Sequence, residues 1–303
     1  MAGQDHGSVK AILYALGANF GIALAKGGAA IWTGSGAMLA ETIHSVADCA
    51  NQVLLLIGLK HAARPATAEH PLGYGKVMYF WSLIVALLLF SVGGLFSVHE
   101  GIERFRHAEA LKDPWIAIGI LVFSIVLEAF SLWGALRIIR ERQGSRTFWQ
   151  WFRVTRNSEL MVVAGEDIAA LAGLAFALVA LLLAVATGNP VFDAAGSFAI
   201  GVLLIVVAIA IVCEVKSLII GESADPLVHD AVGRFITARP EVESVLNLIT
   251  LQWGDRVVVA VKARMKETRD GVRLIEQINA CEAALRQQFP EVSWVFFEPD
   301  ATD

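Results

Sequence analysis

The chain has 303 residues, of which 56% are hydrophobic and 17% are charged, and its formal net charge is −5. An ordinary soluble domain has about 25% charged residues, and one water-soluble core could not bury this much apolar sequence. The composition therefore disfavours a soluble enzyme, a disordered protein and a nucleic-acid-binding protein.

Six long apolar segments predict six membrane-spanning helices. A helix needs about 20 mostly apolar residues to cross a bilayer core about 30 Å thick, because each residue adds about 1.5 Å. The segments that meet this length are residues 11–33, 37–58, 78–98, 114–136, 159–187 and 191–214. We expect them to form a transmembrane transport domain over residues 1–220.

The basic residues beside these segments predict how the chain crosses the membrane. Lys and Arg gather in the cytoplasmic loops of membrane proteins. Eleven of them lie on the side of the N-terminus, and three, Arg104, Arg106 and Lys112, lie on the other side. This asymmetry favours both termini in the cytoplasm. Since no organelle-targeting extension is obvious, we expect a bacterial inner membrane.

Residues 221–303 predict a small cytoplasmic domain. Helices are expected at 226–237 and 271–288, and strands at 245–252, 256–265 and 292–298. The order αββαβ favours a ferredoxin-like α+β fold, in which helices cover one face of a sheet. A domain of about 80 residues has a marginal core of its own, so we expect it to dimerise with another copy of the chain.

The second predicted span carries polar side chains that are costly at bilayer depth and are therefore candidates for function. Glu41, His44, Asp48 and Asn51 follow one another at spacings of 3, 4 and 3 residues. These spacings place all four on one face of a helix.

The fifth predicted span brings carboxylates to the same depth. Glu166 and Asp167 are adjacent there. Asp167 and Asp48 lie about nine and ten residues from the cytoplasmic ends of their spans, so both are about 14–15 Å deep. An imidazole from His44 and carboxylates at one level are typical ligands of a divalent cation such as Zn²⁺.

A structural explanation of these polar groups stays open. Polar side chains also hold membrane helices together, and a His–Asp pair four residues apart can hydrogen-bond to itself. Three ionisable groups at one depth favour a metal site over such a pair. Glu128 and Asp193 are more typical of structural or gating groups. Lys26, inside the first span, is expected to pack there or to extend its ammonium toward the membrane surface.

Three segments carry motifs typical of a known membrane protein family. Residues 34–48 read Gly-Ser-Gly-Ala-Met-Leu-Ala-Glu-Thr-Ile-His-Ser-Val-Ala-Asp, residues 70–76 read His-Pro-Leu-Gly-Tyr-Gly-Lys, and residues 292–299 read Val-Ser-Trp-Val-Phe-Phe-Glu-Pro. Together they resemble the cation diffusion facilitator family, over residues 9 to 300 or so. Asn51-Gln52 and Glu166-Asp167 are most similar to the branch that contains zinc transporter nine.

The resemblance implies a homodimeric exporter of Zn²⁺ or a related divalent ion, driven by inward proton flow. Such a protein is a secondary active transporter and not an enzyme, and the metal is its cargo rather than a prosthetic group. The implied metal ligands are His44, Asp48 and Asp167. Because metal ligands must lose protons before they bind, metal and protons compete for one site. An unperturbed imidazole titrates near pH 6.5, within the physiological range.

Two positions depart from the family pattern. Val163 stands where the family usually has His or Asp, which leaves Glu166, Asn51 or water as the fourth ligand. The loss of one imidazole shifts the ligand set toward oxygen, so Fe²⁺ and Mn²⁺ become further candidate substrates. Tyr74 replaces a second loop histidine, so Glu69 and His70 are only weak candidates for a loop metal site.

Two other functions stay open as alternatives. One is an intramembrane metal-dependent enzyme. A membrane di-iron enzyme would need more histidines than the seven present, most of which lie outside the predicted spans. The other is a membrane sensor or scaffold with a soluble signalling tail. The tail contains no catalytic motif, no glycine-rich phosphate loop and no nucleic-acid-binding patch.

Overall fold

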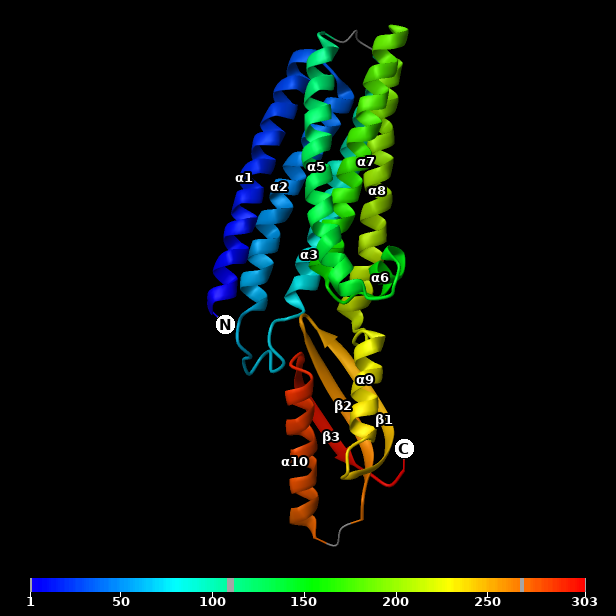
Figure 1. Ribbon diagram of the computed structural model, residues 1–303. Coiled ribbons are helices and arrows are strands. Elements are labelled where there is room, and N and C mark those ends of the chain that lie inside the picture. Colours follow the sequence, from blue (N-terminus) through cyan, green and yellow to red (C-terminus); the bar gives the residue numbers. More distant parts are fainter. Residues whose placement is uncertain (1, 108–111, 268–269, 303) are drawn as a thin grey trace. The chain divides into compact units, whose positions relative to one another are not determined.

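The computed structural model describes residues 2–107, 112–267 and 270–302, without the side chains of residues 2–15, 18 and 142. The chain divides into two compact units (Figure 1). The first comprises residues 1–60, 80–148 and 158–215, and the second comprises residues 61–79, 149–157 and 216–303. The second unit thus includes two segments that lie between membrane helices in the sequence.

Long helices build the first unit. They are α1 (Ala2–Thr33), α2 (Gly36–Ala62), α3 (Val77–Leu88), η1 (Leu89–Leu95), α4 (Phe96–Arg106), α5 (Pro114–Gln143), α7 (Ser158–Thr187) and α8 (Val191–Ile220). Within the described residues, five are long and apolar enough to cross a membrane: α2, the continuous run Val77–Arg106, α5, α7 and α8. These confirm five of the six predicted spans. The remaining predicted span, residues 11–33, falls in helix α1, and the structure does not describe all the side chains of that helix.

Small residues allow α4 to approach α8 closely. A Cβ added to Gly201 of α8 would lie 2.5 Å from the backbone nitrogen of Val98. One added to Gly101 would lie 2.7 Å from the backbone nitrogen of Phe198. No side chain fits at such distances, so both glycines permit the helix contact, as small residues commonly do in membranes.

A carboxylate from α8 caps the start of α2. Asp193 is 2% exposed and accepts hydrogen bonds from Ser35 Oγ and from the backbone N–H of Gly36, each at 2.6 Å. The first N–H groups of a helix have no partner within the helix, so this carboxylate satisfies one of them. The contact gives Asp193 the structural role expected of it.

The second unit contains the predicted α+β domain. Its elements are α9 (Pro226–Thr237), β1 (Val242–Trp253), β2 (Arg256–Met265), α10 (Gly271–Gln288) and β3 (Val292–Pro299). The sheet has the order β1-β2-β3, with β1 antiparallel and β3 parallel to β2. This confirms the order αββαβ. The short helix α6 (Phe148–Val154) belongs to this unit too and was not predicted.

Local signals explain where both helices of this domain begin. Asp225 accepts a hydrogen bond from the Leu227 N–H at 2.8 Å, and Pro226 occupies the first helical position. Asp270 accepts one from the Val272 N–H at 3.0 Å. Both carboxylates satisfy N–H groups that the helix itself leaves unpaired.

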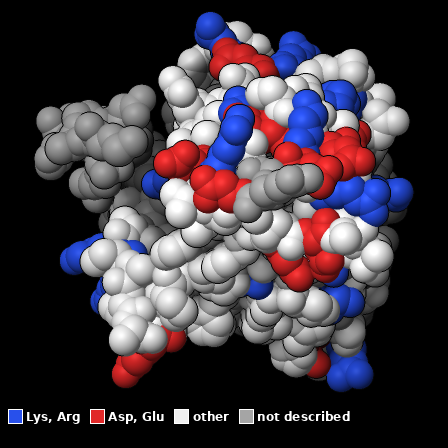
Figure 2. Space-filling model, turned by 90° about the horizontal axis from the view of Figure 1, so that it is seen from below, with Lys and Arg blue, Asp and Glu red and all other residues white. Residues whose placement is uncertain are grey.

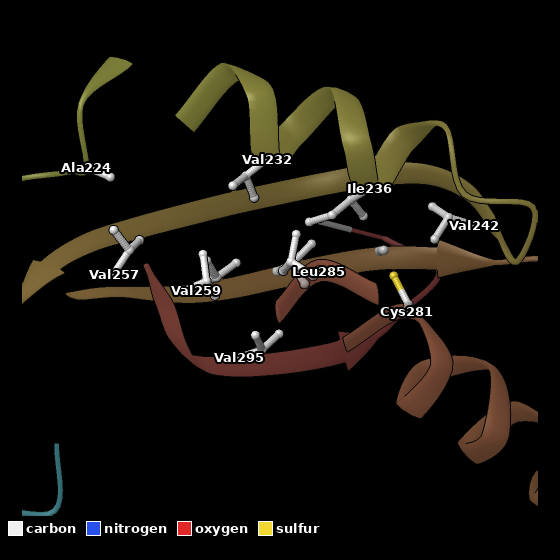
Figure 3. Packing of buried hydrophobic residues seen from close by; sticks show 12 residues of the cluster. Ala224, Val232, Ile236, Val242, Val257, Val259, Cys281, Leu285 and Val295 are labelled. Atoms are coloured by element: carbon white, nitrogen blue, oxygen red, sulfur yellow. The ribbon is translucent and has the colours of Figure 1, made fainter. Parts of the chain in front are cut away.

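The core of the domain lies between its helices and one face of the sheet (Figure 3). Every second residue of β2 points into it, which is the alternation expected of a half-covered strand. The labelled core side chains include Val232 and Ile236 of α9, Cys281 and Leu285 of α10, and Val257, Val259 and Val295 of the sheet. Seen from below, acidic and basic side chains are interspersed rather than separated by sign (Figure 2).

The loop that follows α2 packs against the turn between β1 and β2. The indole N–H of Trp253 donates to the Gly73 carbonyl at 3.2 Å, and Lys76 Nζ lies 4.6 Å from the centroid of the Trp253 ring. The Tyr79 hydroxyl accepts from the Gly254 N–H at 3.0 Å and donates to the Gly254 carbonyl at 3.3 Å. Partial burial at this contact lowers the pKa of the Lys76 ammonium.

Candidate metal site

His44 and Asp48 of α2 are the two strongest candidate ligands, one an imidazole and the other a carboxylate. His44 is fully buried, and neither of its ring nitrogens has a hydrogen-bond partner in the described part of the chain. Its Nδ1 lies 3.7 Å from Asp48 Oδ1, which is too far for a hydrogen bond. Asp48 Oδ1 is buried without a partner as well. Since buried polar atoms are nearly always paired, these atoms indicate a partner that is not part of the chain.

The adjacent carboxylates of α7 turn toward different neighbours. Glu166 is 8% exposed and accepts a hydrogen bond from Asn51 Nδ2 of α2 at 2.5 Å. Asp167 accepts one from Ser131 Oγ of α5 at 3.3 Å. Successive helical residues point about 100° apart, which accounts for the divergence. Contact with α2 therefore favours Glu166, although the sequence favours Asp167 of the two.

Glu128 of α5 belongs to the same neighbourhood. Its carboxyl group interacts electrostatically with His44 and Asp48, and Asp167 interacts with both Asp48 and Glu128. Sequence reasoning assigns Glu128 a structural or gating role. An ionisable residue near the middle of an apolar helix is costly, and this feature of the sequence could have placed Glu128 beside the candidate ligands.

The candidate ligands share a neighbourhood without forming a closed set. Among the described side chains, no three His, Cys, Asp or Glu residues are grouped closely enough to hold a metal ion. His44 and Asp48 lie on α2, and Glu166 and Asp167 lie on α7. The packing of these two helices therefore determines the distance between the two pairs of side chains. The arrangement supplies nitrogen and oxygen donors that suit a divalent cation.

Lys26 packs inside the helical unit, which is the first of the two alternatives that the sequence leaves open for it. Its side chain is 0% exposed, and Nζ donates to Glu41 Oε2 at 3.2 Å and to Ser45 Oγ at 2.9 Å. Two partners on α2 hold the ammonium inside the helical unit. A buried charge of this kind persists only when it is paired.

The weaker loop candidates lie in a different environment. Glu69 and His70 are exposed, and the ring of His70 meets that of Tyr74 edge-on, with centroids 4.5 Å apart. A loop metal site would need a second imidazole beside His70, and the ring of Tyr74 lies there instead. Val163 is half-buried one turn before Asp167.

Comparisons with known proteins give a family match over most of the chain. The family model described as the cation efflux transmembrane domain matches residues 12–220. Metal tolerance protein C4 of Arabidopsis thaliana is 32% identical over 246 residues, which are 80% of this chain and 54% of that protein. The mitochondrial proton-coupled zinc antiporter SLC30A9 of Xenopus laevis is 32% identical over 226 residues, which are 74% of this chain and 40% of that protein.

A shorter match extends to bacteria. The magnetosome protein MamM of Magnetospirillum gryphiswaldense is 33% identical over 96 residues, 29% of this chain and 30% of that protein. The chain thus spans 54% or less of the length of these three relatives.

Proposed function

Because the chain belongs to the cation efflux family, resembling its branch around zinc transporter nine, we propose that it moves a divalent cation across a membrane in exchange for protons. One observation carries the proposal. The imidazole of His44 and a carboxylate oxygen of Asp48 are buried, and neither has a hydrogen-bond partner among the residues that the structure describes. A membrane protein has little reason to keep such groups unpaired unless a ligand uses them.

The donor set accounts for the coupling to protons. His44 and Asp48 bind the cation as a neutral imidazole and a carboxylate, and Glu166 or Asp167 of α7 completes the set with Asn51 or water. Each ligand must lose its proton before the metal binds, so entering protons displace the metal and entering metal displaces protons. A small movement of α7 relative to α2 would close or open the set.

Zn²⁺ is the proposed principal substrate. Zinc accepts mixed nitrogen and oxygen ligands, and one relative carries the name of a proton-coupled zinc antiporter. A single imidazole among oxygen donors also suits harder ions, so Fe²⁺ and Mn²⁺ are the further candidates. The activity is that of a secondary active transporter, and the two alternatives, an enzyme and a sensor, gain no support from the site.

The domain in the second unit offers a surface for a second copy of the chain. On the face opposite the core, Ile249 is 59% exposed, Phe296 is 56% exposed and Trp294 is 38% exposed. The strand register places Ile249, Ala260 and Phe296 in one row. We call this surface the open sheet face; an apolar patch of this kind marks an interaction site.

The charges beside the open sheet face favour a copy of the same chain as its partner. Lys262 Nζ lies 3.1 Å from Asp300 Oδ2 and 4.0 Å from Glu298 Oε1 at its edge. A surface with both signs at one edge can pair with itself across a two-fold axis. We propose a homodimer with both termini in the cytoplasm. A bacterial inner membrane stays a prediction, although one relative is named as mitochondrial.

The test is metal uptake into proteoliposomes that contain a metal-sensitive dye and carry a proton gradient, with Zn²⁺, Fe²⁺ and Mn²⁺ compared. Asp48→Ala should abolish the flux while the protein stays folded, because a methyl group neither binds the ion nor exchanges a proton. Asp230→Ala, at an exposed position of α9, is the matched control and should transport normally. Wild-type protein without metal flux would contradict the function, and full transport by Asp48→Ala would contradict the site.

A further inference from the structure

An ion pair inside the membrane helices stands next to the proposed ligands without belonging to them. Lys26 Nζ and Glu41 Oε2 lie 3.2 Å apart, and both side chains are 0% exposed. Ser45 accepts a hydrogen bond from the same ammonium at 2.9 Å. Among the Lys and Arg side chains that the structure describes, Lys26 is the one that is fully buried.

The chain places this pair one helical turn from the ligands. Glu41 precedes His44 by three residues on α2, and Ser45 follows His44 directly. The charge of Lys26 acts on His44, Asp48 and Glu128 as well as on Glu41. The pair therefore contributes to the electrostatic field in which a bound cation would lie.

The second oxygen of Glu41 points toward the other helix of the site. A Cβ added to Gly173 of α7 would lie 2.6 Å from Glu41 Oε1, so only glycine leaves room for the carboxylate there. This oxygen is buried and has no hydrogen-bond partner in the described part of the chain. Glu41 thus lies between Lys26 of α1 and Gly173 of α7.

A fixed pair of this kind controls how strongly the neighbouring carboxylates attract a cation. In an interior of low effective dielectric, a single unpaired charge acts over longer distances than it does in water. Glu41 cancels the positive charge of Lys26, and Lys26 cancels the extra negative charge of Glu41. A bound cation would then experience mainly the charge of its own ligands.

We infer that Lys26 and Glu41 set the affinity of the His44–Asp48 site for its divalent cation through their charges, without contacting the ion. This inference rests on the proposed function. It makes the two residues positioning groups, and the loss of either one alone shifts the metal affinity, in opposite directions.

A double-mutant cycle on uptake tests the inference. Lys26→Met leaves Glu41 unpaired, so the half-saturating Zn²⁺ concentration should fall by on the order of tenfold and turnover should slow as release becomes harder. Glu41→Gln leaves the ammonium unpaired, so the half-saturating concentration should rise by a similar factor. In the double variant, both charges are gone and the value should move back toward that of the wild type.

A surface pair provides the matched control. Arg106 and Glu103 form an ion pair at 3.3 Å, but their side chains are 68% and 42% exposed. Water and salt screen such charges, so Arg106→Met and Glu103→Gln should leave the half-saturating concentration unchanged.

A purely structural pair would behave differently. Both single variants and the double variant would then lose turnover together, with no opposite shifts in half-saturation, and that result would overturn the inference. Zn²⁺ binding to the same variants in detergent, followed by calorimetry, supplies a readout that does not need flux. It also bypasses low turnover, and the double variant removes the unpaired buried charge that could unfold a single variant. Binding constants that shift oppositely without any flux would support the inference and contradict transport.

Discussion

We expect single side chains to decide which ion the proposed site prefers. Val163 is half-buried on α7, four residues before Asp167 and therefore on the same helix face. Asp167 itself turns toward Ser131 of α5. With the apolar Val163 at this position, the proposed ligand set contains a single imidazole, that of His44.

Val163→His should change ion preference rather than abolish transport. A second imidazole adds a softer ligand one turn from Asp167, so Zn²⁺ uptake should gain over Mn²⁺ uptake by about tenfold. The measurement is competition between the two ions in proteoliposomes. Val163→Leu, which adds no ligand, should keep the wild-type ratio. An unchanged ratio in Val163→His would mean that position 163 does not face the metal.

The sequence predicts the site only as far as helical spacing reaches. His44 and Asp48 share a face because they are four residues apart on one helix. The choice between Glu166 and Asp167 depends on how α7 is rotated, and that rotation is fixed by contacts such as Asn51 with Glu166, 115 residues away in sequence. The partner of Lys26 could not be predicted for the same reason, since an ammonium inside a span can either pair or extend to the surface.

Among the elements, α4 and α8 form a contact that tolerates little added volume. Both sides approach through glycine, and the atom nearest to an added Cβ at Gly201 and at Gly101 is a backbone nitrogen, which cannot move aside as a flexible side chain can. The π-helical segment η1, just before α4, was not predicted, because such segments form where packing requires an extra residue in a turn. By contrast, α9 and α10 match their predicted bounds, since Asp225, Pro226 and Asp270 mark their starts.

Gly201→Val should separate α4 from α8. The added side chain has no space beside Val98, so the free energy of unfolding should fall by about 1–3 kcal/mol. The measurement is the thermal unfolding midpoint in detergent, which should fall with it. Gly119→Ala of α5 is the control, because nothing lies within 4 Å of a Cβ added there. A midpoint for Gly201→Val equal to that of the control would show that the two helices can move apart freely.

At the scale of the whole molecule, the second unit is more than the C-terminal tail. The sequence separates residues 221–303 from the membrane body, whereas the unit also contains residues 61–79 and 149–157. Arg156 bonds to Glu222 at 2.9 Å and to the Ser223 carbonyl at 2.7 Å within it. Such contacts join segments far apart in the chain, and sequence patterns do not reveal them.

The open sheet face predicts the assembly of the full-length protein. Wild-type protein in detergent should sediment as a dimer, because the face is apolar. A metal chelator should not change the mass of this dimer, because the carboxylates at the edge of the face already pair with Lys262. Phe296→Glu places a charge on that face and should yield monomers. Val272→Glu, at a position of α10 that is 65% exposed, should remain dimeric. A dimer that falls apart with chelator would instead indicate a metal bridge between the copies.

The buried pair of Lys26 and Glu41 also constrains how the protein is made. The two residues lie on consecutive helices, and only Gly34 and Ser35 separate the end of α1 from the start of α2. An ammonium alone in the hydrocarbon is costly, and so is a lone carboxylate. During biosynthesis, we expect the first two helices to leave the translocon together as a hairpin, with the opposite charges already joined. A truncated chain that contains α1 without α2 should therefore integrate poorly, and a chain that contains both helices should integrate well.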